Sequence, residues 1–216
     1  MQYILSHFNV VLEKLAEHMT LSLVASLLAA LIGVPLGIFI AKRKILKKPV
    51  ITAVNIIYTT PSMALFTFLI PFMGIGSKPA TISLMLYCLM NIVINTAAGI
   101  EGVDRSIIEA ATGMGMTKME LLFKVELPLG LPLIMAGIRL SIVMSINIAT
   151  VASYIGAGGL GDLVLSGIFS MNVDKILAGA IPICLLAFVT DHLLALLEKR
   201  LSRWSQSETA VKPAKA

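Results

Sequence analysis

Five long apolar runs constrain this chain more than any other feature of its sequence. Each run has about 20 mostly apolar residues, the length that a helix needs to cross the hydrocarbon core of a bilayer. Only helices and closed barrels satisfy their backbone hydrogen bonds in lipid, and these runs are too long and too evenly apolar for barrel strands. We therefore predict an all-α integral membrane protein with five transmembrane helices, at 20–41, 50–72, 79–100, 129–152 and 176–197.

The composition agrees with a membrane location. Hydrophobic residues make up 57% of the 216 residues and charged residues only 13%, whereas a soluble domain is roughly a quarter charged. The net charge of +5 does not indicate a nucleic-acid partner, because the basic residues stand at the ends of the apolar runs. Cys88 and Cys184 both lie inside such runs, so we interpret them as packing residues and expect no metal site.

The distribution of Lys and Arg predicts the orientation in the membrane. Most of the 17 basic residues fall at 42–48, 101–128 and after 197, and a five-span topology places these three segments on one side. Segments that face the cytoplasm carry such an excess of positive charge. We therefore expect the N-terminus outside the cell and the C-terminus in the cytoplasm.

The two ends of the chain differ from the membrane-spanning unit, which we place at 20–200. Residues 1–19 lack the basic start and the long apolar core of a signal peptide, and they fit a short amphipathic helix at the membrane interface. Residues 201–216 are polar, and we expect them to form a disordered cytoplasmic tail.

Several polar residues fall at membrane depth inside the predicted spans. An unsatisfied amide in hydrocarbon is costly, so these side chains should face other helices or a water-filled path. Two interpretations stay open: hydrogen bonding between helices, or lining of a translocation pathway. The candidates for the pathway are Asn55, Tyr58, Asn91, Asn95, Ser145, Asn147 and Thr150.

Prolines and one arginine make the spans irregular. Pro35 and Pro61 are expected to kink the first two spans, because proline removes a helical hydrogen bond. Arg139 lies about ten residues into the fourth span, where it is expected to snorkel or to pair with Glu101 or Asp104. Acidic residues are absent from the middle of every predicted span except for Asp191, late in the fifth. That absence argues against an ion-coupled carrier.

No sequence motif points to catalysis by this chain. The glycine-rich string at 156–161 formally matches G-x-G-x-x-G, but a dinucleotide site needs a βαβ unit around it. Here a membrane span precedes the string, so we expect its glycines to form a tight turn instead. The chain also lacks a P-loop motif and a plausible Ser/His/Asp set, and we therefore expect no catalytic residues and no enzyme activity.

The charged segment 101–128, between the third and fourth spans, is predicted to form two short helices exposed to water. Asp104 or Ser106 can cap the first helix. Thr117 can cap the second, with Glu120 three residues later completing a capping box. A short helix that stands off the membrane can dock in a groove on a partner.

Within this segment, Glu109-Ala110-Ala111 and the later Leu127-Pro128 resemble the EAA loop of binding-protein-dependent ABC importer permeases. The general pattern, E-A-A-x(3)-G, places its glycine at Gly115, and Gly113 is an additional one. The strings at 58–66 and 155–161 make the chain similar to the osmoprotectant branch, whose members transport glycine betaine, carnitine or choline. This resemblance covers roughly residues 20–200.

The resemblance implies a set of partners and a bacterial inner-membrane location. These partners are a cytoplasmic ABC ATPase dimer, a second permease subunit (identical or related) and an extracellular substrate-binding protein. ATP and Mg²⁺ would be bound by the ATPase, and this chain would bind no cofactor. The resemblance assigns ATPase coupling to Glu109, Ala110, Ala111, Gly113, Gly115, Met116 and Thr117.

Two alternatives remain. Methionine-type permeases share the string at 156–161 and the five-span size, so the resemblance does not fix the substrate. The chain can also be a structural membrane subunit without a transport role.

Overall fold

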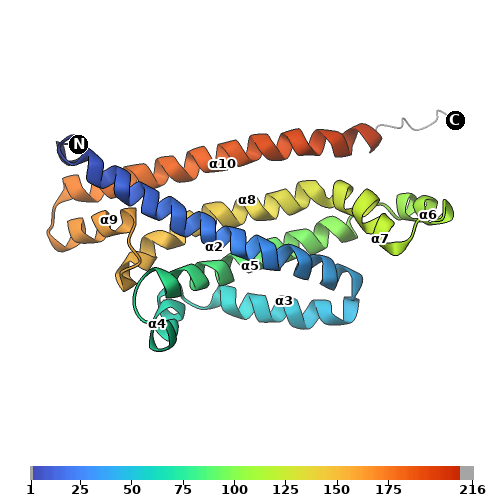
Figure 1. Cartoon of the computed structure of the whole chain (residues 1–216), viewed down its shortest axis with the longest axis horizontal. Coiled ribbons are helices and arrows are strands. Elements are labelled where there is room, and N and C mark those ends of the chain that lie inside the picture. Colours follow the sequence, from blue (N-terminus) through green and yellow to red (C-terminus); the bar gives the residue numbers. More distant parts are fainter. Residues whose placement is uncertain (1, 210–216) are drawn as a thin grey trace.

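The computed structural model describes residues 2–209, and the only regular elements in that range are helices (Figure 1). This result confirms the predicted all-α class. The α-helices are α1 (Gln2–Ser6), α2 (Phe8–Lys42), α3 (Lys44–Thr59), α4 (Ser62–Met73), α5 (Ser77–Glu101), α6 (Arg105–Gly113), α7 (Lys118–Leu121), α8 (Leu127–Ala152), α9 (Leu160–Phe169) and α10 (Val173–Thr209). A π-helical turn (Leu122–Glu126) joins α7 to α8, and a 3-10 turn (Ser153–Ile155) follows α8.

Four of these helical segments are long and apolar enough to cross a membrane: α2, α5, α7 continued into α8, and α10. Helices α3 and α4 pass the same test only together, and they are bent by 96° at the break between them. The described residues therefore provide four spans, or up to five if the bent pair is one span.

The second predicted span, at 50–72, is wrong as a single helix. Thr60 precedes a proline and adopts an extended backbone, with φ −66° and ψ 132°, because Pro61 sterically disfavours the helical conformation before it. The Tyr87 hydroxyl of α5 donates a hydrogen bond to the Thr60 carbonyl. This bond satisfies a backbone acceptor that the break in the helix would otherwise leave free. By contrast, α2 stays helical through Pro35.

Helices α2, α5 and α8 form the centre of the bundle (Figure 1). Leu21 and Ala25 of α2, Leu84 of α5 and Ala149 of α8 belong to one buried cluster. Gly37 lets α2 approach α5 closely, since a Cβ there would come within 2.6 Å of the Thr96 Cβ. This close packing fixes the positions of the helix ends that carry the site described below.

The ends of the chain depart from the predicted boundaries. Helix α2 runs without a break from Phe8 through the expected boundary at residue 19. Helix α10 continues to Thr209, so the first part of the predicted tail at 201–216 is helical. The rest of that tail, at 210–216, lies outside the described residues.

Arg139 of α8 pairs with α10, and the expected pairing with Glu101 or Asp104 is wrong. Its Nε and Nη2 lie 2.6 and 3.0 Å from the two carboxylate oxygens of Asp191. Its Nη1 lies 3.2 Å from Glu198. Asp191 and Glu198 are seven residues apart on one face of α10, so the fork of a single guanidinium joins them to α8.

Candidate partner-docking site

Helices α6 and α7 project from one end of the bundle (Figure 1). Asp104 caps α6: its Oδ1 accepts hydrogen bonds from the Ser106 backbone N–H (2.8 Å) and the Ser106 hydroxyl (2.9 Å). These two bonds, the backbone bond first, lower the pKa of Asp104 below its ordinary value. The predicted cap is therefore present, and it fixes where α6 begins.

One face of α6 turns inward and the opposite face is open to solvent. Ala111 is buried, and Ile107 and Ile108 are half-buried. Glu109 and Ala110 are exposed. The helix therefore presents the first two residues of the Glu-Ala-Ala motif outward and uses the third for packing.

A Schellman motif ends α6 and turns the chain. The N–H of Gly115 donates to the Thr112 carbonyl (3.0 Å), and the N–H of Met116 donates to the Ala111 carbonyl (3.2 Å). Gly115 has φ +84°, a left-handed conformation that strongly favours glycine. Gly113 is the last residue of α6 itself, so the left-handed position of the turn is taken by Gly115.

Helix α7 carries the predicted capping box. The Glu120 N–H donates to the Thr117 hydroxyl (3.3 Å), and the Glu120 carboxylate accepts from the Thr117 N–H (3.0 Å). Lys124 donates to the second carboxylate oxygen of Glu120 (2.9 Å). These local bonds hold four-residue α7 in place, although a helix of this length is not stable alone.

Three large apolar side chains on this segment are exposed: Met114 (73%), Met119 (62%) and Phe123 (59%). We call these three residues, with Glu109 and Ala110, the docking face. Exposed apolar groups of this size on a segment outside the bundle are also common at surfaces that bind partners. The sequence gave no sign that Met114 is exposed.

Two ion pairs connect the base of this segment to the other helices. Glu126, in the π-helical turn, is buried and pairs with Lys42 at the end of α2. Glu101, at the end of α5, pairs with Lys47 of α3 at 2.5 Å. The first pair therefore joins the π-helical turn to α2, and the second joins α5 to α3.

The pathway candidates Asn91, Asn95 and Ser145 lie between helices. The Asn95 amide donates to the Asn91 carbonyl (2.8 Å), and the Asn91 amide contacts Met144 Sδ (3.5 Å). The Ser145 hydroxyl is buried and donates to the Ser22 carbonyl (3.1 Å). All three have partners inside this chain, and the two asparagines remain partly exposed.

The other four pathway candidates do not gather at one place. Asn147 is exposed on α8 and bonds back to Val143. The Thr150 Oγ1 is buried without a hydrogen-bond partner among the described residues. Asn55 and Tyr58 are half-buried on α3, where Tyr58 makes an edge-to-face contact with Tyr87 at 6.5 Å.

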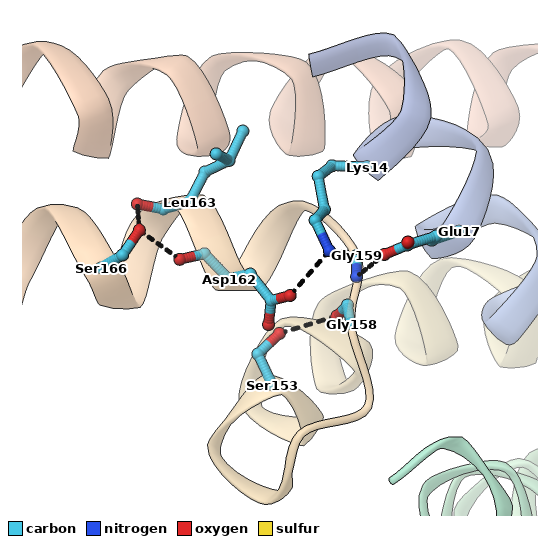
Figure 2. A network of polar contacts seen from close by, with 8 residues as sticks. All are labelled: Lys14, Glu17, Ser153, Gly158, Gly159, Asp162, Leu163 and Ser166. Atoms are coloured by element: carbon cyan, nitrogen blue, oxygen red, sulfur yellow. Dashed lines mark hydrogen bonds and ion pairs between the residues drawn. The ribbon is translucent and has the colours of Figure 1, made fainter. Parts of the chain in front are cut away.

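The glycine string at 156–161 forms the expected tight turn, at the end of the bundle opposite to α6 and α7 (Figures 1 and 2). Gly156, Gly158 and Gly159 have φ of +73°, +85° and +83°. The Gly159 N–H donates to Glu17 of α2 (2.8 Å), and the Ser153 hydroxyl donates to the Gly158 carbonyl (2.9 Å) (Figure 2). The sequence gave no sign of this network.

The Lys14 ammonium of α2 lies 2.9 Å from Asp162 of α9 (Figure 2). The network therefore ties the start of α2 to the turn after α8. The polar groups drawn in this network have partners within the chain, and we therefore interpret the network as holding the turn in position against α2.

A bundle of helices long and apolar enough to cross a membrane, with α6 and α7 projecting from one end (Figure 1), defines a multi-pass membrane protein. The family described as binding-protein-dependent transport system inner membrane component matches residues 33–203. The chain belongs to this family.

Curated relatives match almost the whole chain. The choline transport system permease protein OpuBB of Bacillus subtilis (strain 168) is 42% identical over 201 residues, covering 93% of both chains. The carnitine transport permease protein OpuCB of Listeria monocytogenes is 46% identical over 186 residues, covering 86% of this chain and 85% of the relative. The osmoprotectant import permease protein OsmW of Salmonella typhimurium is 41% identical over 201 residues, covering 91% and 94%.

Solved structures share the fold at lower identity. An inward-facing structure of the MetNI methionine ABC transporter aligns with a TM-score of 0.83 and 20% identity, covering 90% of this chain and 97% of that one. The crystal structure of an amino acid ABC transporter with histidines aligns with a TM-score of 0.71 and 21% identity, covering 92% of this chain and 97% of that one. At this identity the likeness establishes the fold alone.

Proposed function

We propose that this chain is the permease subunit of an ATP-driven ABC importer for osmoprotectants such as glycine betaine, carnitine or choline. The observation that carries the proposal is the docking face. Glu109 and Ala110 of the capped helix α6 are exposed, and so are Met114, Met119 and Phe123 in the residues that follow it. Such a face is suited to a groove on a water-soluble partner.

The partner for this face is a cytoplasmic ABC ATPase dimer, one subunit for each of two permease subunits. The ATPase binds ATP and Mg²⁺ and hydrolyses the nucleotide, while this chain supplies the path through the membrane. Glu109 pairs with a basic residue of the ATPase, and small Ala110 allows close approach. Closure of the ATPase pair then draws two α6–α7 segments together.

The contacts around the segment suggest how movement reaches the membrane. The π-helical turn at Leu122–Glu126 connects α7 directly to α8, and π-helical turns often stand at functional positions. The Lys42–Glu126 pair connects the same turn to α2. A displacement of α7 is therefore passed to α8 and α2, which lie in the centre of the bundle.

The charge distribution supports a cytoplasmic location for the docking face in a bacterial inner membrane. Lys42, Arg43, Lys44, Lys47 and Lys48 stand at the α2–α3 corner, near the same end of the bundle as α6 (Figure 1). Positive charge marks the cytoplasmic ends of spans. Five crossings, with α3 and α4 as one broken span, then place the N-terminus outside and the C-terminus in the cytoplasm.

The relatives support the substrate class. Their names specify choline, carnitine and glycine betaine transport. Aromatic residues make up only 6% of this chain, and quaternary ammonium ligands are usually held by several aromatic rings. An extracellular substrate-binding protein therefore supplies the selectivity, and the permease passes the substrate on.

Uptake by the complete complex tests this proposal. The permease, ATPase and binding protein are reconstituted in liposomes, and uptake of labelled glycine betaine, carnitine, choline and methionine is measured at low and high salt. ATP-dependent uptake of a quaternary ammonium compound is the expected result. Uptake of methionine alone would support a methionine-type importer, and no uptake by an assembled complex would favour a structural subunit.

A further inference from the structure

We propose that a pocket at the cytoplasmic base of α6 binds the phosphate of an anionic phospholipid headgroup. The pocket has a volume of about 500 Å³ and lies between the α2–α3 corner, the end of α5 and the start of α6. This volume falls within the range of roughly 300–1,000 Å³ that is usual for small-molecule sites. The proposal rests on the proposed function for its cytoplasmic orientation.

Basic side chains outnumber acidic ones in this pocket. Four cations line it, from Lys42, Lys44, Lys47 and Arg105, together with the carboxylates of Glu101 and Glu126. Because Lys42 pairs with Glu126 and Lys47 pairs with Glu101, both carboxylates are already neutralised.

Lys44 and Arg105 are the two cations that remain. Neither has a carboxylate within ion-pair distance among the described residues. They come from different parts of the chain, α3 and α6, and they line one cavity. An anion between them would satisfy both, and the planar guanidinium of Arg105 is well suited to two phosphate oxygens.

The remaining walls of the pocket are apolar. Ile100 and Val103 from the α5–α6 connection and Ile108 from α6 contribute them. Next to the pocket, Ile45 at the α2–α3 corner is 90% exposed, and a second hollow of about 640 Å³ is lined by residues 41–46. Cations beside exposed apolar groups at the end of a span fit the boundary between headgroups and acyl chains.

This combination favours a lipid over a soluble anion. Basic pockets between helices on the cytoplasmic side of a membrane are typical binding sites for anionic headgroups. A soluble phosphate would use the two cations but would leave the apolar walls and Ile45 in water. A lipid covers both kinds of surface.

A lipid in this pocket touches the docking segment directly. Arg105 and Ile108 belong to α6, whereas Lys44 begins α3. The headgroup therefore links the start of the ATPase-coupling helix to the α2–α3 corner. Anionic lipid would hold α6 against the bundle, and the ordering of α6 would depend on the lipid composition of the membrane.

Native mass spectrometry of the full chain, purified in detergent, tests the proposal. Palmitoyl-oleoyl phosphatidylglycerol, the corresponding phosphatidylcholine and inorganic phosphate are titrated separately. The test variant is Lys44→Gln with Arg105→Gln. The control is Lys48→Gln with Lys118→Gln, which removes the same charge from two exposed residues outside the pocket.

We expect the wild-type chain to retain phosphatidylglycerol and to release phosphatidylcholine. The test variant should lose about tenfold or more in affinity for phosphatidylglycerol, and the control should bind like the wild type. Exchanging the two cations, as Lys44→Arg with Arg105→Lys, should preserve binding. Preserved binding in this exchange variant would show that the test variant loses affinity for phosphatidylglycerol because it lacks the two charges, and not because substitution at these positions disrupts the fold.

Three outcomes would overturn the proposal. Equal losses in the test and control variants would show attraction to overall charge only. Displacement of the lipid by inorganic phosphate at equal concentration would define a soluble-anion site. Unchanged binding of phosphatidylglycerol by the test variant would show that Lys44 and Arg105 do not form the site. Failure of the transport proposal is seen separately, as absent uptake by the wild-type complex.

Discussion

Gly115→Ala should weaken the turn between α6 and α7 through the backbone alone. Gly115 has φ +84°, and a Cβ at this position meets nothing within 4 Å. The substitution therefore creates no clash, and its cost is that of a non-glycine residue in the left-handed region, roughly 1–2 kcal/mol. That free energy corresponds to a factor of about 5–30 in the equilibrium between the closed and the opened turn.

Gly113→Ala is the matched control. Gly113 is the last residue of α6, with no positive φ, and a Cβ there also meets nothing within 4 Å. Alanine in a helix is favoured over glycine by roughly 0.5–1 kcal/mol. The two substitutions add the same methyl group two residues apart, yet they should change the stability of the turn in opposite directions.

Amide hydrogen exchange in lipid nanodiscs measures this difference. The Gly115 and Met116 amides donate to the Thr112 and Ala111 carbonyls, so their exchange reports opening of the turn. Exchange of a peptide over 112–117 should become about 5–30-fold faster in Gly115→Ala and no faster in Gly113→Ala. Equal effects of the two substitutions, or slower exchange in Gly115→Ala, would refute this reasoning.

Three further predictions concern the charge on α6, the polar residues between spans and the link to α10. Glu109→Lys should abolish ATP-driven uptake in the reconstituted complex while the protein still reaches the membrane; survival of both uptake and ATPase association would exclude Glu109 from docking. Asn95→Leu should lower uptake without loss of assembly, and unchanged uptake kinetics would assign Asn95 to helix packing. Thermal unfolding of Arg139→Ala, Asp191→Ala and the double variant should give an interaction energy of about 0.5 kcal/mol or more, whereas additive effects would mean that the observed pair contributes nothing.

The sequence predicted the features of this fold that depend on local chemistry. The long helices could be predicted from the apolar runs, because a membrane span needs about 20 apolar residues whatever elements surround it. The starts of α6 and α7 could be predicted from Asp104, Thr117 and Glu120. A capping side chain bonds to backbone groups only two or three residues away, so its effect is visible in the local sequence.

The features that the sequence did not predict depend on residues far apart in the chain. The pairing of Arg139 with Asp191 requires the relative rotation of α8 and α10, which no local pattern contains. The 96° break at Thr60–Pro61 was expected only as a kink, because the angle depends on what α4 packs against. The exposure of Met114 follows from the direction of the Schellman turn, whereas methionine in general is among the residues that are most often buried.

Site-directed cross-linking tests the central claim most directly. In a Cys184→Ser background, which removes the exposed native thiol, a cysteine replaces Met114 on the docking face. The comparison position is Phe169, which is 78% exposed at the opposite end of the bundle (Figure 1). Both variants are treated with a short thiol-to-amine cross-linker in membranes that contain the complete complex.

The proposed function predicts that Met114→Cys forms a covalent adduct with the ATPase and that Phe169→Cys does not. It also predicts that a membrane-impermeant thiol reagent added to intact cells labels Phe169→Cys and leaves Met114→Cys unlabelled. Labelling of Met114→Cys from outside the cell, or an ATPase adduct at Phe169→Cys alone, would contradict the assignment of the docking face.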